Sequence, residues 1–177
     1  MRKNAILCTV LAVLGTQITT AQRQSGCALP SGLSEEIASK YPKARVVTLA
    51  DLDEDDKKQF QSEHGSQCPG LTSVNFYGDG KPTLAVVLFF DEARGANPQL
   101  IVAHEVQNHW QLRSLERQST GPVPVVWREE PGKYNDVYGE KTLEAVNPVI
   151  VLWGAYGSWA ILYAWTGNRV EKIWIRD

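Results

Sequence analysis

Short apolar runs recur along the chain, and their spacing is that of β-strands. The run at 83–90 is apolar at nearly every position, so we expect a central strand that is covered on both faces. Residues 73–77 precede it across the stretch Gly-Asp-Gly-Lys-Pro at 78–82, which is typical of a hairpin turn. The pattern predicts further strands at 45–49, 100–106, 110–115, 123–127, 149–153, 159–165 and 169–175.

Two segments near the start of the chain have helical signals instead. Residues 30–42 lie between two prolines, with Ser34 placed to cap a helix and acidic residues in the turn that follows it. Residues 51–64 form a second, polar segment that ends at a glycine. We therefore predict an α+β fold, with two short N-terminal helices packed on a mainly antiparallel β-sheet, in a single domain spanning 22–177.

The first 21 residues have the pattern of an export signal. Arg2 and Lys3 precede an apolar run over residues 5–14, and small residues follow at 19–21. The run is shorter than the roughly 20 apolar residues that a membrane span requires, and no later stretch qualifies. We expect residues 1–21 to be a signal peptide, no membrane span, and a periplasmic or secreted product.

The charge balance argues against one class of partner. Once Arg2 and Lys3 leave with the predicted signal, the 18 basic residues fall to 16 against 20 acidic residues, which gives a net charge of −4. Proteins that bind nucleic acid or anionic lipid generally need a basic face. We expect no nucleic-acid partner.

Two cysteines remain after the predicted cleavage, because Cys8 lies in the signal. An even number of cysteines in an exported protein predicts a disulfide between Cys27 and Cys68. It would close a loop of about 40 residues and contribute about 4 kcal/mol to stability. The alternative, a lipid on Cys27, has weaker support because residues 24–26 lack the apolar residue that such a site needs.

Residues 103–110, AHEVQNHW, come close to the zinc-protease motif His-Glu-x-x-His. His109 follows His104 by five positions rather than four, so the rings would lie about 140° apart on a helix. On a strand they would point to opposite faces. We expect a hairpin with Asn108 and His109 in its turn, and neither a metal nor another cofactor.

Two acidic loops resemble calcium sites without completing them. In the loop that starts at Asp51, Asp56 replaces the required glycine and Ser62 the required glutamate, so we expect Asp51 or Asp53 to cap a helix instead. The turn at 78–80 resembles the calcium loop of FG-GAP repeats, but its other ligand positions are not acidic. A single copy also cannot form a propeller. We expect a tight hairpin without metal.

Short motifs follow one another along most of residues 27–177. They are Cys27-x-Leu-Pro30, Tyr41-Pro42, Leu49-x-Asp-Leu52, Cys68-Pro-Gly70, Gly78-Asp79-Gly80, Tyr163-x-Trp-x-Gly167 and the closing Asp177. In this order they resemble a family of uncharacterised, exported bacterial proteins. The resemblance implies the compartment and the fold, and it implies no particular chemistry.

The end of the chain is rich in aromatic residues, with four of the six tryptophans in its last 25 positions. On a strand, Trp159, Tyr163 and Trp165 share one face. Together with Tyr156 they could form a surface that binds a protein or glycan partner. The alternative is that these rings face the core, as aromatic residues at strand spacing usually do.

No motif for nucleophilic catalysis or phosphate binding is present in the sequence. We therefore expect a non-enzymatic binding protein, and we assign no catalytic residue. The alternative is a hydrolase of cell-envelope material that assembles carboxylates from distant segments. Glu129, Glu130 and Asp136 are available for such a role.

Overall fold

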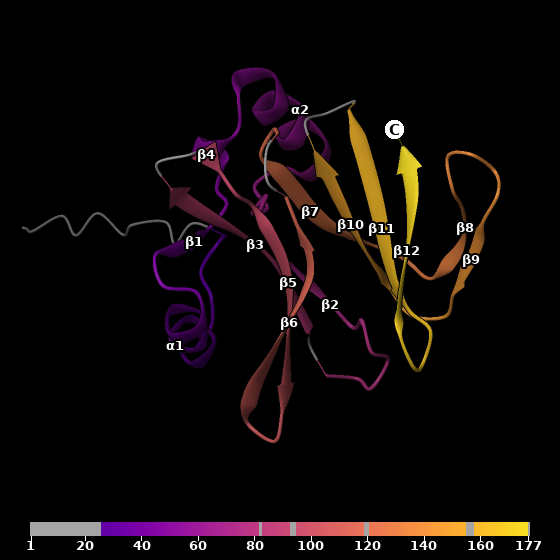
Figure 1. Cartoon of the computed structure of the whole chain (residues 1–177), viewed down its shortest axis with the longest axis horizontal. Coiled ribbons are helices and arrows are strands. Elements are labelled where there is room, and N and C mark those ends of the chain that lie inside the picture. The colour runs from indigo at the N-terminus through magenta and orange to yellow at the C-terminus, as the bar shows by residue number, and fades with distance from the viewer. Residues whose placement is uncertain (1–25, 82, 93–94, 119–120, 155–157, 177) are drawn as a thin grey trace, which may run out of the picture.

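The computed structural model describes residues 26–176 apart from 82, 93–94, 119–120 and 155–157. The predicted signal peptide therefore lies outside the described residues. Within them the chain is mainly β, with antiparallel sheets and two α-helices. Figure 1 shows the two larger sheets side by side, with α1 beside the first sheet and α2 at one end of the molecule. None of the described helices is long and apolar enough to cross a membrane.

The first sheet is built around strand β3. Its order is β1-β3-β5-β6, and β2 and β4 also pair with β3. β5 follows one edge of β3, while β1 and β2 occupy successive stretches of the other edge. The bounds are β1 Ala44–Val46, β2 Leu71–Val74, β3 Thr83–Glu92, β4 Gly95–Ala96, β5 Gln99–Val106 and β6 His109–Arg117.

The second sheet has the order β12-β11-β10-β7, with all neighbours antiparallel. A separate pair, β8 and β9, forms a hairpin that the sequence pattern did not predict. The backbone N–H of Val137 in this hairpin donates to the carbonyl of Trp174 (2.7 Å), which holds it beside β12. The bounds are β7 Pro124–Glu129, β8 Gly132–Asn135, β9 Thr142–Ala145, β10 Val149–Gly154, β11 Trp159–Trp165 and β12 Val170–Arg176.

Strand β3 sends alternate side chains into two different cores. Ala85 and Val87 belong to the core shared by the two larger sheets. Val86 and Leu88 point to the opposite face, where they pack under α1. All four are fully buried. The prediction that 83–90 is a central strand covered on both faces is confirmed, and the period of two explains how one strand serves both cores.

Helix α1 spans Ser31–Lys40 and covers the outer face of the first sheet. Leu33 and Ile37, one turn apart, are its buried residues. The prediction that Ser34 caps this helix is wrong. The helix begins at Ser31, with Pro30 at the N-cap position and no side-chain cap, and the Ser34 hydroxyl donates to the carbonyl oxygen of Ser31 (2.8 Å).

Helix α2 spans Glu54–His64 and begins as predicted at an aspartate cap. The carboxylate of Asp53 accepts hydrogen bonds from the backbone N–H groups of Asp55 (3.1 Å) and Asp56 (2.8 Å). Acidic residues fill the first turn, where the helix dipole favours negative charge. Phe60 is the buried residue of this helix and joins the core shared by the two larger sheets.

The predicted single sheet is divided into separate sheets. The physical reason is that four strands carry apolar side chains on both faces and bury both of them. These strands are β3, β5, β10 and β11. Two short helices cannot cover that much apolar surface. The second sheet therefore packs on the first and supplies the missing cover, as the shared core shows.

The two larger sheets meet along one side of the molecule and are joined by side chains on the other. Near β2 and β7 the backbone N–H of Val126 donates to the carbonyl of Pro69 (2.8 Å). β6 and β12 are the edge strands of the two sheets on the side away from β2 and β7. There the carboxylate of Glu116 accepts hydrogen bonds from the Tyr163 hydroxyl (2.7 Å) and the Lys172 ammonium (2.9 Å).

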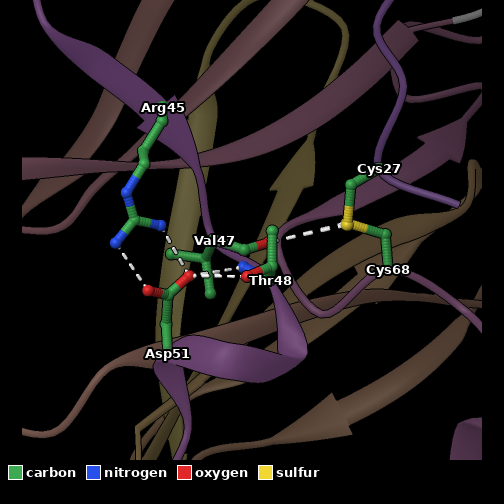
Figure 2. Close-up of a disulfide and its surroundings, with 6 residues drawn as sticks. All are labelled: Cys27, Arg45, Val47, Thr48, Asp51 and Cys68. Atoms are coloured by element: carbon green, nitrogen blue, oxygen red, sulfur yellow. Dashed lines mark hydrogen bonds and ion pairs between the residues drawn. A yellow bond between two sulfur atoms is a disulfide. The ribbon is translucent and has the colours of Figure 1, made fainter. Parts of the chain in front are cut away.

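The predicted disulfide is present and joins Cys27 to Cys68, with 5.0 Å between the Cα atoms. Figure 2 shows the sulfurs beside the carbonyl oxygen of Val47, at 3.7 and 3.5 Å. A Cβ at Gly70 would come within 2.5 Å of the same oxygen. The close approach of these segments therefore requires glycine at position 70.

The carboxylate of Asp51 joins the segment after β1 to Arg45 in that strand (Figure 2). Its carboxylate accepts two hydrogen bonds from Arg45 (2.7 and 2.6 Å) and two from Thr48, through the backbone N–H (2.8 Å) and the hydroxyl (2.9 Å). Burial alone would raise the pKa of Asp51, but these hydrogen bonds and the guanidinium charge outweigh it. The pKa is therefore lowered.

Replacing Cys68 with alanine should reduce the free energy of unfolding by about 2–5 kcal/mol, because the unfolded chain gains the freedom of a 41-residue loop. For a chain of this size the melting temperature should fall by roughly 5–20 °C. Calorimetry of the purified protein measures this fall. A reductant should lower the melting temperature of the unmodified protein and leave that of Cys68→Ala unchanged. A mass that does not change on reduction contradicts the disulfide.

The substitution Asp51→Asn should lower the melting temperature by a few degrees at pH 7, since it removes the charged partner of Arg45. The folded-state pKa lies below the ordinary 3.8. The stabilisation is thus fully present above that pH and disappears as the pH falls through the folded-state pKa. Asp55→Asn, at a side chain that is 98% exposed, is the control and should have little effect. A loss that is the same at pH 7 and pH 2 would refute the assignment.

Candidate functional site

A hollow of about 420 Å³ lies where β6 faces the end of β11. One of the predicted binding residues, Trp165, forms part of its wall. We call it the aromatic hollow. Its lining residues are Tyr77, His104, Gln111, Leu112, Arg113 and Trp165.

The rings of the aromatic hollow hold one another in place. Tyr77 is central, with its ring 5.1 Å from that of Trp165 at an angle of 73° and 4.6 Å from that of His104. Phe76, which is fully buried, packs edge-on against Tyr77 at 5.3 Å. These separations are those of favourable aromatic pairs. The wall of the hollow is therefore arranged before any ligand arrives.

His104 is held by hydrogen-bonding groups on both ring nitrogens. Nε2 lies 3.1 Å from the carboxylate of Asp79, and Nδ1 lies 3.2 Å from the hydroxyl of Thr83. A neutral ring with its proton on Nε2 satisfies both contacts. Asp79 in turn accepts a hydrogen bond from the backbone N–H of Lys81 (3.0 Å). The hairpin loop that follows β2 thus fixes the orientation of the histidine.

The same three residue types can activate a nucleophile in hydrolases. Here Thr83 is 0% exposed, so no substrate carbon can reach its hydroxyl. Asp79, His104 and Thr83 therefore act as a structural set that orients the imidazole, and they do not form a usable nucleophile.

Arg113 supplies positive charge to the aromatic hollow. Burial raises the pKa of Tyr77, and the nearby guanidinium of Arg113 offsets only part of that rise. Tyr77 is therefore a neutral phenol at physiological pH. The residues that line the hollow include this cation and no carboxylate. A ligand would meet aromatic faces, hydrogen-bonding groups and one guanidinium.

Of the residues predicted to form an aromatic surface, the three that the structure describes do not make one patch. Tyr163 is 1% exposed and lies in the core, because β11 is covered on both faces. Trp159 lies at the other end of β11 from Trp165, with its ring 6.2 Å from that of Trp174. Tyr156 lies outside the described residues. Trp165 is the member of the set that lines the aromatic hollow.

A second, smaller hollow of about 160 Å³ adjoins the first, and Arg113 lines both. Its other lining residues are Ser114, Leu115, Tyr163, Val170 and Lys172. We call it the adjoining hollow. Burial and the Glu116 carboxylate raise the pKa of Tyr163 far above its ordinary range, so its hydroxyl stays protonated and donates to Glu116.

The two histidines of the motif that resembles a zinc site line different hollows. His104 belongs to the aromatic hollow, whereas His109 lines a larger one near α1. The predicted hairpin between them is confirmed. Its turn is formed by Gln107 and Asn108, both with positive φ, and His109 already belongs to β6. Across the described residues no group of three histidine, cysteine, aspartate or glutamate side chains could hold a metal ion.

A larger hollow, of about 610 Å³, lies between α1 and the β5–β6 hairpin. Carboxylates from both sides line it, Glu35 and Glu36 from α1 and Glu105 from β5, together with the indole of Trp110. We call it the acidic hollow. Here the structure brings together carboxylates from segments far apart in the sequence.

The three carboxylates considered in the sequence have separate, local roles. Glu129 accepts a hydrogen bond from the indole N–H of Trp127 (2.9 Å). The carboxylate of Glu130 pairs with the guanidinium of Arg128 (3.5 Å). Asp136 accepts a backbone N–H within the turn between β8 and β9 (3.1 Å). None of these contacts joins one of the three carboxylates to another.

Five residues that line the aromatic hollow were not predicted as site residues from the sequence: Tyr77, His104, Gln111, Leu112 and Arg113. Gln111 and Arg113 alternate on a predicted strand, and Gln111 is the register partner of His104. The strand pattern could have grouped these three. It could not have placed them opposite Trp165, which belongs to the other sheet.

Comparisons of the chain with protein-family models, with curated proteins and with solved structures found no match. The function is therefore inferred from the geometry of the site and the chemistry of its side chains.

Proposed function

We propose that this protein is exported and binds a glycan in the aromatic hollow, without catalysing a reaction. The observation that carries the proposal is the half-buried ring of Trp165, which Tyr77 holds edge-on beside planar hydrogen-bonding side chains. The C–H face of a sugar ring packs well on an indole. The amide of Gln111 and the guanidinium of Arg113 can then bind its hydroxyl groups.

The size and shape of the site favour a small ligand over a flat protein partner. A cavity of about 420 Å³ is within the usual range for small-molecule sites. A stable protein interface needs about 800 Å² from each partner, and the predicted aromatic residues are not gathered in a patch of that kind. Of the partners considered for the aromatic residues, a glycan fits the observed hollow best.

Export is supported by the signal pattern at residues 1–21 and by the disulfide. Disulfides persist in oxidising compartments and are rare in the cytosol. The order of motifs, which resembles that of a family of exported bacterial proteins, agrees with this location. A glycan ligand is also a reasonable expectation for such a protein, because periplasmic and extracellular proteins work among cell-envelope and environmental polysaccharides.

Replacing Trp165 with alanine should weaken glycan binding about tenfold or more, because it removes the stacking surface. A glycan array followed by titration calorimetry on the best ligand measures the change. Trp159→Ala is the matched control, since it removes an indole from the other end of the same strand. Equal affinities for the Trp165→Ala variant and the unmodified protein would overturn the proposal.

The acidic hollow supports a second candidate function, hydrolysis of cell-envelope glycans. Glycosidases use two carboxylates across the scissile bond, one as acid and one as base or nucleophile. Glu35 and Glu36 face the same hollow as Glu105, and Trp110 could pack against a sugar ring.

If the acidic hollow is catalytic, the protein should release reducing ends from peptidoglycan or another envelope glycan, and Glu105→Gln should lower the rate by at least a hundredfold. Glu144→Gln, at an exposed position on β9, is the control. The absence of any release by the unmodified protein removes this second candidate and leaves the binding proposal untouched.

A further inference from the structure

We infer that the ligand is an acidic oligosaccharide, with one ring on Trp165, its carboxylate on Arg113 and the next sugar in the adjoining hollow. This inference rests on the proposed function, because it names the class of glycan for the same site. It arises from the position of Arg113 between the two hollows.

Arg113 is the residue that the two hollows share. On one side of it lie the rings of Trp165 and Tyr77, and on the other lie Val170 and Lys172. A guanidinium binds a carboxylate through two parallel N–H donors. The guanidinium lies close enough to Tyr77 to lower its pKa, and the five N–H groups of arginine provide donors for a ligand.

The charges around Arg113 favour an anion. Carboxylates are absent from the linings of both hollows as described. Two carboxylates lie beside the hollows and are already engaged, Asp79 by His104 (3.1 Å) and Glu116 by the Lys172 ammonium (2.9 Å) and the Tyr163 hydroxyl (2.7 Å). The chain as a whole carries a net charge of −2, so an acidic ligand is not attracted by the rest of the protein. Local positive charge must therefore provide the selectivity.

The two hollows lie one after the other along the same strand. Both follow β6, the first beside residues 111–113 and the second beside 113–115. The pairing of β5 with β6 shifts between Leu100 and Ile101, so that Leu115 is the extra residue of a bulge. Bulges re-aim side chains and bend a strand. An extended chain of sugars can thus lie along β6 with the second sheet on its other side.

The test compares acidic oligosaccharides with neutral ones of the same length and linkage. The probes are tetramers of galacturonic acid and of mannuronic acid, each beside the neutral tetramer obtained by reducing its carboxyl groups. Titration calorimetry at low salt measures the affinities, and a second series at high salt measures screening. At least one acidic tetramer should bind ten- to a hundredfold more tightly than its reduced counterpart, and salt should reduce that preference.

Variants of the cation show whether Arg113 is responsible. Arg113→Gln should abolish the preference for the acidic tetramer, and Arg113→Lys should keep part of it, because lysine retains the charge without the paired donors. Arg117→Gln is the matched control, an exposed arginine on the same strand outside both hollows. Lys172→Gln should weaken binding of the acidic tetramer and leave the affinity for the acidic monosaccharide unchanged. Circular dichroism confirms that each variant is folded.

The outcomes separate this inference from the proposed function. Equal binding of acidic and reduced tetramers, or an equal loss in Arg113→Gln and Arg117→Gln, overturns the inference. If neutral tetramers bind and Trp165→Ala abolishes that binding, the proposed function stands while the acidic class is wrong. If no tetramer of either kind binds, the inference is overturned, and the proposed function is decided by the glycan array.

Discussion

The Cys27–Cys68 disulfide holds together the segments that meet along one edge of β3. Its sulfurs lie beside the carbonyl oxygen of Val47, while the backbone N–H of Val47 donates to the carbonyl of Val87 (3.0 Å). The N–H of Val87 donates in turn to the carbonyl of Gly70 (2.8 Å). The end of β1 and the start of β2 are thus bound to the same residue of β3. The loop after β2, which carries the tyrosine of the aromatic hollow, takes its position from this junction.

The site follows from how the two larger sheets are joined. They meet by a backbone hydrogen bond near β2 and β7, whereas side chains join them where β6 faces β11 and β12. There Glu116 accepts a hydrogen bond from the neutral Tyr163 hydroxyl, and the Lys172 ammonium balances its charge. Arg113 remains between two hollows without a carboxylate in either lining. The contact of Glu116 with Tyr163 and Lys172 joins the two sheets and leaves the Arg113 guanidinium available to a ligand.

Residue types alone are a poor guide to chemistry at this site. Asp79, His104 and Thr83 are the kinds of residue that a hydrolase uses, and they are within hydrogen-bonding distance. The threonine is fully buried behind the histidine, so the set orients a ring and exposes no nucleophile. Binding requires only that the ring be fixed in place, and the geometry meets that requirement. Accessibility, rather than composition, separates the two roles.

The sequence by itself determined several of the local elements and the cross-link. A run that is apolar on both faces predicts a central strand at 83–90, Asp53 has the chemistry of a helix cap, and two remaining cysteines predict a disulfide. The binding site was decided only by tertiary structure. Trp165 and Arg113 belong to strands of different sheets, and a period of two indicates which face a side chain takes but not which strand will lie opposite. For the same reason the sequence pattern assigned Tyr163 to a surface, because alternation of residues along a strand cannot show that both of its faces are covered.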